Sequence, residues 1–96
     1  MVKELLKDLN CNYAVEDNDL EVVKEKLLEF MLKVLTLREY NLICFRYDID
    51  ENHDGKKRTY KELSELFCYS DELIFNTVKR ALLKLKVKGV KKALEG

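Results

Sequence analysis

The sequence contains no proline and only three glycines, Gly55, Gly89 and Gly96. Tight β-turns depend on these two residue types, and helix interiors exclude them, so their scarcity favours long helices over a sheet. No apolar run approaches the length that crosses a bilayer. The N-terminal stretch MVKELLKDLN is charged throughout, unlike the apolar part of a signal peptide. The 96 residues, 47% of them hydrophobic, suit one small domain.

Cysteine and histidine, which bind transition metals and serve in catalysis, are also scarce. Cys11, Cys44 and Cys68 are odd in number and form no C-x-x-C pair, and His53 is the single histidine. This pattern indicates reduced thiols in a cytoplasmic protein and not a disulfide framework. Because there is no paired nucleophile and base and no glycine-rich phosphate loop, the sequence predicts neither an enzyme nor a bound cofactor or metal.

One short stretch argues for a metal at first sight. Residues 50–55 read D-x-N-x-D-G, as at the start of a calcium-binding EF-hand loop. The twelfth position of that loop is Lys61, where the site needs a bidentate glutamate. Lys56, Lys57 and Arg58 would repel a divalent cation. Calcium binding is therefore disfavoured, and the stretch is interpreted as a connecting loop.

Charge is unevenly distributed although the formal net charge is zero. Residues 1–36 carry 5 lysines and 8 acidic residues, a net charge of −3. Residues 71–96 carry 7 basic and 3 acidic residues, a net charge of +4, and all seven basic residues fall between Lys79 and Lys92. An acidic head and a basic tail indicate two different partners or one locally anionic partner, although solvated helix faces give the same pattern.

Apolar residues at steps of three and four predict four helices after a short candidate helix at 2–9. The predicted helices cover about 18–35, 36–47, 59–67 and 71–86. Two of them open with T-x-x-E capping boxes, in which Thr36 pairs with Glu39 and Thr59 pairs with Glu62. Ser70 is the predicted cap of the last helix.

These helices define a domain over 18–88, with an N-terminal segment at 1–17 and a basic tail at 89–96. Gly89 is a plausible stop for the last long helix, and the tail is either a short amphipathic helix or a frayed end. A short helix, a tight turn and a longer helix make a helix-turn-helix. The predicted fold is therefore all-α, a compact bundle of four to five helices ending in a helix-turn-helix.

Two segments, 35–50 and 59–86, carry a more specific pattern. The first supplies Leu35, Thr36, Arg38, Glu39, Arg46, Tyr47, Ile49 and Asp50. The second supplies Thr59, Glu62, Phe67, Ser70, Glu72, Ile74, Ala81, Leu82, Lys84, Leu85 and Lys86. In this order they resemble the C-terminal domain, the fourth conserved region, of housekeeping-type bacterial sigma factors. The D-x-N-x-D-G loop falls where that family has a variable linker.

The resemblance implies a bacterial or phage transcription protein without catalysis. In the family, this domain reads the −35 promoter element with its last long helix and docks on the flap of the RNA polymerase β subunit through earlier helices. Double-stranded promoter DNA and the RNA polymerase core are thus the implied partners. The sigma regions that melt the −10 element and grip the core enzyme's clamp are not present, so the chain is either a fragment or a stand-alone protein that does not start transcription by itself.

The residues expected to contact DNA are Arg58, Thr59, Ser70, Glu72, Asn76, Lys79, Arg80 and Lys84. Glu72 retains a family carboxylate that can accept from cytosine N4, and Asn76 can pair with adenine. Where the family has three further arginines, this chain has Asp71, Leu73 and Phe75. Their loss removes guanine and phosphate contacts and puts promoter reading of the ordinary kind in doubt.

The residues expected to contact a protein partner are Leu27, Phe30, Met31, Leu73 and Phe75. For the first three a core role is favoured residue by residue, although a pocket between helices would be built from such side chains. Leu73 and Phe75 make the last long helix apolar beyond its core face, which favours contact with the N-terminal segment, a second copy or another protein. Two hypotheses therefore stand, a DNA-binding regulator and a sigma-domain mimic that acts mainly through protein contact.

Overall fold

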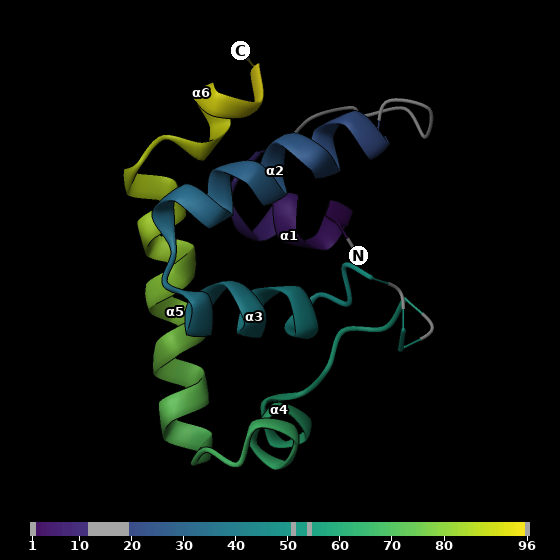
Figure 1. Cartoon of the computed structure of the whole chain (residues 1–96), viewed down its shortest axis with the longest axis vertical. Helices are drawn as coiled ribbons and strands as arrows, with labels where there is room; N and C mark the ends of the chain where they lie inside the picture. The colour runs from purple at the N-terminus through teal and green to yellow at the C-terminus, as the bar shows by residue number, and fades with distance from the viewer. Residues whose placement is uncertain (1, 12–19, 51, 54, 96) are drawn as a thin grey trace.

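A computed structural model describes residues 2–11, 20–50, 52–53 and 55–95. Within these ranges the chain forms six helices and no strand, which confirms the all-α prediction (Figure 1). The helices are α1 (Val2–Asp8), α2 (Leu20–Val34), α3 (Leu37–Arg46), α4 (Tyr60–Phe67), α5 (Asp71–Val87) and α6 (Val90–Glu95). None of them is long and apolar enough to cross a membrane.

Both predicted capping boxes are formed and fix where α3 and α4 begin. The Thr36 hydroxyl accepts from the Glu39 backbone N–H at 3.2 Å, and the Glu39 carboxylate accepts from the Thr36 N–H at 2.9 Å. At α4 the same two bonds join Thr59 and Glu62, both at 3.1 Å. Each box satisfies two backbone N–H groups that a helix start leaves without partners.

The connections after α4 and α5 are equally well defined. Cys68 ends α4 in the left-handed conformation, with φ 59°, and Ser70 caps α5 by accepting from the Leu73 N–H at 3.2 Å. A three-residue turn, 68–70, therefore separates the two helices. After α5 the chain turns at Gly89, whose φ of +81° favours glycine, and the predicted stop is confirmed.

The first and last helices belong to the same core as the other four. Leu5 and Leu6 of α1 and Val90 and Leu94 of α6 are buried with the apolar side chains of α2, α3 and α5. The tail forms a helix, one of the two alternatives left open for it, and this helix packs against α2 and α5 with Val90 and Leu94 on its buried face.

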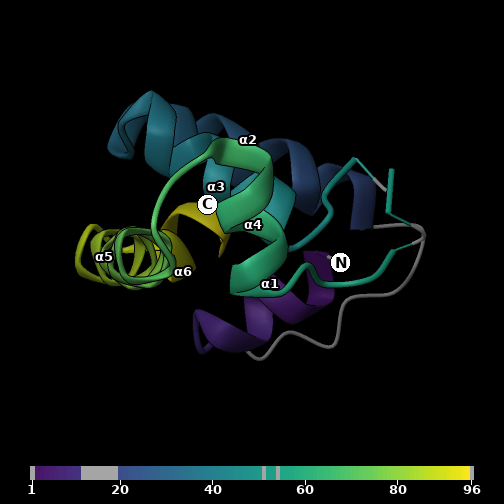
Figure 2. The ribbon, with the colours of Figure 1, turned by 90° about the horizontal axis from the view of Figure 1, so that it is seen from below.

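The longest helix, α5, contacts α2, α3, α4 and α6. Figure 2 looks nearly along α5, with α4 crossing beside its N-terminal end, and Figure 1 shows α3 lying across the side of α5. The buried residues Leu42 and Ile43 of α3, Leu63 of α4 and Ile74 of α5 form the core of this three-helix unit. The unit presents the outer face of α5 to solvent.

Candidate nucleic-acid interface

Opposite faces of α5 differ sharply in exposure. Its buried residues are Ile74, Thr77, Val78, Ala81 and Leu85, which recur at helical spacing on one side. The predicted DNA contacts Glu72, Asn76, Lys79 and Arg80 are all exposed. The structure therefore brings these four side chains onto the solvent-facing part of one helix, with Glu72 at its N-terminal end and the two cations further along.

Lys84, the fifth predicted contact on α5, is engaged inside the protein. Its Nζ donates to the Glu39 Oε1 at 2.8 Å, and the Glu39 side chain is only 5% exposed. Burial raises the pKa of Glu39, but the hydrogen bonds from Lys84 and Thr36 outweigh it, so the pKa lies below its usual value. Lys84 joins α5 to the capping box of α3 and does not extend the exposed cationic face.

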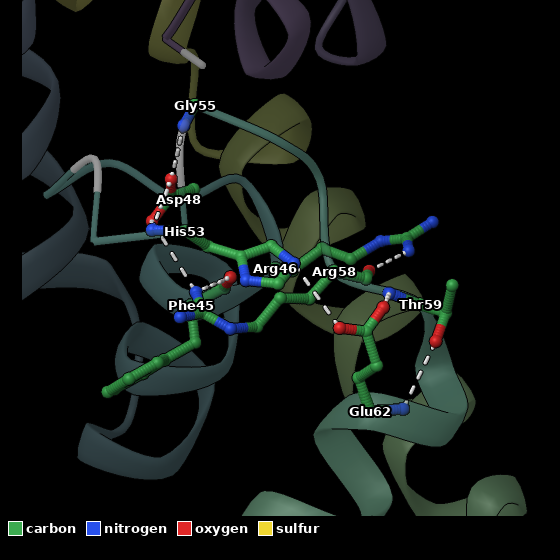
Figure 3. Close-up of polar contacts among 8 residues, drawn as sticks. All are labelled: Phe45, Arg46, Asp48, His53, Gly55, Arg58, Thr59 and Glu62. Carbon is green, nitrogen blue, oxygen red and sulfur yellow. Dashed lines mark hydrogen bonds and ion pairs between the residues drawn. The ribbon is translucent and has the colours of Figure 1, made fainter.

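Arg58 is likewise held by the protein, at the C-terminal end of α3 (Figure 3). Its Nη1 donates to the Phe45 carbonyl at 2.9 Å and lies 3.5 Å from the Asp48 carboxylate. The Arg58 side chain is 14% exposed. The guanidinium donates to a carbonyl at the end of α3 and pairs with the buried Asp48 carboxylate. The phosphate contact expected from the sequence would compete with these two interactions.

The loop after α3 is organised by Asp48, a residue that the sequence-based interpretation missed. Its carboxylate accepts from the backbone N–H of His53 and from that of Gly55, at 2.9 and 2.8 Å (Figure 3). Burial raises the pKa of Asp48, but these N–H groups and Arg58 lower it below its usual value. Asp48 lies two residues before the D-x-N-x-D-G stretch, which begins at Asp50, and its backbone has a left-handed φ of 48°.

The D-x-N-x-D-G stretch is only partly described by the structure. Asp54, its third carboxylate or amide, lies outside the described residues. Among the described residues, no three His, Cys, Asp or Glu side chains gather as metal ligands would. Backbone N–H groups of His53 and Gly55, together with the Arg58 guanidinium, offset the charge of the buried Asp48 carboxylate that shapes this loop.

The loop is also tied to α4, the helix that precedes the turn. His53 Nε2 lies 3.3 Å from the Glu62 carboxylate. The Arg46 guanidinium donates to the Arg58 carbonyl and stacks on the Tyr60 ring, 4.2 Å from its centroid. These contacts set the first turn of α4 against the end of α3, and Tyr60 in that turn packs on Phe75 of α5.

The two apolar residues predicted at the start of α5 are only partly exposed. Phe75 is 44% exposed and packs edge-to-face on Tyr60, with ring centroids 5.4 Å apart. The Lys79 ammonium lies 5.7 Å from the Phe75 ring centroid. Leu73 is 37% exposed. Part of the apolar surface of Phe75 is thus buried within the chain, and Leu73 faces solvent.

The predicted partner contacts on α2 occupy different positions. Leu27 and Met31 are buried in the core, with 1% and 0% exposure, so their side chains offer no surface to a partner. Phe30 is partly buried against that core. This difference in burial follows from the helical repeat, which turns Leu27 and Met31 toward the core and leaves Phe30 at the edge of the buried face of α2.

A groove that no sequence pattern predicted lies between the end of α3 and α4. It is open, has a volume of about 450 Å³ and is lined by Phe45, Arg58, Glu62, Glu65 and Leu66. Phe45 and Leu66 are 38% and 53% exposed, so an apolar floor is bordered by charged side chains. Only the fold could reveal it, because α3 and α4 are separated in the sequence by the Asp48 loop.

No protein-family model matches this chain, and no solved structure matches it.

Proposed function

We propose that this chain is a helix-turn-helix transcription regulator that binds promoter DNA, similar in kind to the fourth region of housekeeping sigma factors, and that it works in the cytoplasm beside RNA polymerase. The observation that carries the proposal is the exposure of Asn76, Lys79 and Arg80 on the outer face of α5. The opposite face of the same helix packs on α3 and α4. A helix held in this way can enter a major groove.

Contacts with phosphate supply most of the affinity in this proposal. Lys79 and Arg80 are the exposed cations at the middle of α5. The hydroxyl oxygens of Thr59 and Ser70 accept helix N–H bonds, and each hydroxyl proton can still be donated to a phosphate oxygen. With Arg58 and Lys84 engaged elsewhere, the expected footprint is small, and binding is correspondingly weak and dependent on salt.

Sequence preference rests on Glu72 and Asn76. A carboxylate can accept from cytosine N4, and an amide can make a bidentate pair with adenine. Asp71 stands beside Glu72 in the first turn of α5 and is also exposed, so it repels the phosphate backbone at the end of the helix nearest the bases. The proposal is therefore a phosphate-anchored reader with modest discrimination among sequences.

The test is a titration of the full chain with duplex DNA carrying a −35-type element and with a scrambled duplex, read by fluorescence anisotropy at several salt concentrations. Lys79→Ala and Arg80→Ala should each reduce the slope of log affinity against log salt by about 1. Lys88→Ala serves as a matched comparison, because Lys88 is an exposed cation at the C-terminal cap of α5. No binding at low salt, or a slope unchanged by either variant, would refute the proposal.

The groove between α3 and α4 supports a second candidate function, contact with a transcription protein such as the flap of the polymerase β subunit. Its exposed Phe45 and Leu66 fit an apolar anchor, and Glu62 and Glu65 on its border fit a basic neighbour. Leu66→Asp should abolish capture of the isolated flap and leave DNA binding unchanged. Capture that survives this change would remove the groove from consideration.

A further inference from the structure

A regularly spaced set of side chains runs along the outer face of α5. Its members are Leu73, Asn76, Arg80, Leu83 and Val87. The steps of three, four, three and four residues are those of the contact positions in a pair of packed helices. Leu73, Leu83 and Val87 are 37%, 60% and 73% exposed, so no described part of the chain covers this seam. An apolar seam left in water indicates a partner surface.

The charges beside the seam identify the partner. Asp71 and Glu72 stand in the first turn of α5, and Lys86 is the exposed cation of its last turn, where Lys84 is already paired with Glu39. The helix is therefore acidic at one end and basic at the other. A parallel copy of α5 would place like charges side by side, whereas an antiparallel copy places each acidic end against a basic end.

We propose that a second copy of the chain covers this face, with the two α5 helices packed antiparallel around a two-fold axis. In that register Leu73 packs against Leu83 of the second copy, and Asn76 faces Arg80 of the second copy. The Asn76 carbonyl can accept from that guanidinium, so the polar seam positions pair with each other. On the flank, Glu72 meets Lys86 of the second copy, and the two-fold symmetry makes each of these three contacts twice.

One contact across the axis opposes this dimer. Lys79 flanks the centre of the seam and meets its own copy there. The Lys79 ammonium lies 5.7 Å from the centroid of the Phe75 ring in its own chain. This cation–π contact holds the charge away from the Lys79 of the second copy. The seam is also only about four turns long, so the interface belongs among small ones and the dimer should dissociate on dilution.

The dimer would compete with DNA. Asn76 and Arg80 lie within the seam, and the proposed function assigns the same two side chains to DNA, so this consequence rests on that function. A dimer hides them, and only the monomer presents α5 to a major groove. Self-association would then act as a reversible block on DNA binding that grows with protein concentration.

Analytical ultracentrifugation of the full chain over a wide concentration range tests the dimer directly. Leu83→Gln removes a seam leucine without adding charge and should weaken association at least about tenfold, since each dimer loses it twice. Leu37→Gln is the matched control, because Leu37 is 71% exposed on α3 and outside the seam. A monomer at every concentration, or equal effects of the two variants, would overturn the proposal.

The antiparallel arrangement has its own test. Glu72→Lys alone should weaken the dimer by setting lysine against Lys86, and Lys86→Glu alone should weaken it by setting two glutamates together. The double variant restores opposite charges and should recover the association of the natural sequence. If the double variant is as weak as the sum of the single variants, the antiparallel pairing is wrong.

Competition is measured with the same proteins and a duplex DNA of unrelated sequence at low salt. At concentrations where the natural chain is dimeric, Leu83→Gln should bind DNA with higher apparent affinity, whereas Leu37→Gln should not. A natural-sequence dimer that binds as tightly as the Leu83→Gln monomer would overturn the competition. Failure of both proteins to bind DNA would overturn the proposed function and leave the dimer standing.

Discussion

Replacing Lys84 with methionine is expected to destabilise the protein and leave the salt dependence of DNA binding unchanged. Lys84 Nζ lies 2.8 Å from the Glu39 Oε1, and the Glu39 side chain is 5% exposed. A hydrogen bond between charged groups contributes about 1.5–3 kcal/mol. Because the Lys84 side chain is 38% exposed, water screens part of this pair, so we expect a loss of about 1–2 kcal/mol in the free energy of unfolding.

Urea and thermal denaturation measure this loss. A change of 1 kcal/mol moves the Tm of a domain of this size by about 4–8 °C. Lys86→Met is the matched control, since Lys86 is exposed on the same helix, and its effect should stay within about 0.5 kcal/mol. In the DNA titration, Lys84→Met should keep the slope of the natural chain, in contrast to Lys79→Ala.

The stabilisation by the Lys84–Glu39 pair should also depend on pH. The folded-state pKa of Glu39 is lowered, so its contribution to stability is present above the unfolded pKa and is lost as pH falls through the folded pKa. The difference between the natural chain and Lys84→Met should therefore be full near neutral pH and decline as the pH falls through the lowered folded-state pKa of Glu39. A reduced DNA salt slope with unchanged stability would refute this reasoning and return Lys84 to the DNA-binding face.

Three further perturbations test the fold around the site. Tyr47→Phe removes the bond that the phenol donates to Asp8 at 2.5 Å while keeping the ring, and should cost about 1 kcal/mol in urea denaturation, more than an exposed Tyr→Phe change would. Burial raises the pKa of the Cys44 thiol to about 11, so alkylation followed by mass spectrometry near pH 8 should modify exposed Cys68 first and reach Cys44 only on unfolding; equal rates would contradict this. Gly55 has φ +67° and open space where a Cβ would sit, so Gly55→Ala should cost about 1–2 kcal/mol through backbone strain alone, and an unchanged Tm would refute that cause.

Local signals in the sequence were sufficient for the helices. The T-x-x-E boxes at Thr36 and Thr59 act within one turn, so their geometry depends on no distant residue. The same holds for the Ser70 cap and for the stop at Gly89. The buried side chains Ile74, Val78, Ala81 and Leu85 of α5 likewise follow from local spacing, because a helix repeats every 3.6 residues wherever it packs.

Whether the tail forms a helix could be decided only from the tertiary structure. Val90 and Leu94 form too short a stripe to establish a helix by themselves, and α6 is stable because α2 and α5 bury that stripe. The candidate helix at 2–9, by contrast, was read from the sequence and is confirmed as α1, whose Leu5 is fully buried in the shared core.

By itself, the sequence determined that the chain is helical, where α3, α4 and α5 begin and which of their faces is buried, because capping and periodicity act over a few residues. The tertiary structure alone decided which charges remain exposed. Lys84 and Lys79 look alike in the sequence, yet Lys84 is paired with Glu39, which lies 45 residues away, and Lys79 faces solvent. The groove beside Phe45 and the role of Arg58 were decided in the same way, because contacts between segments far apart in the chain follow from packing and leave no local pattern.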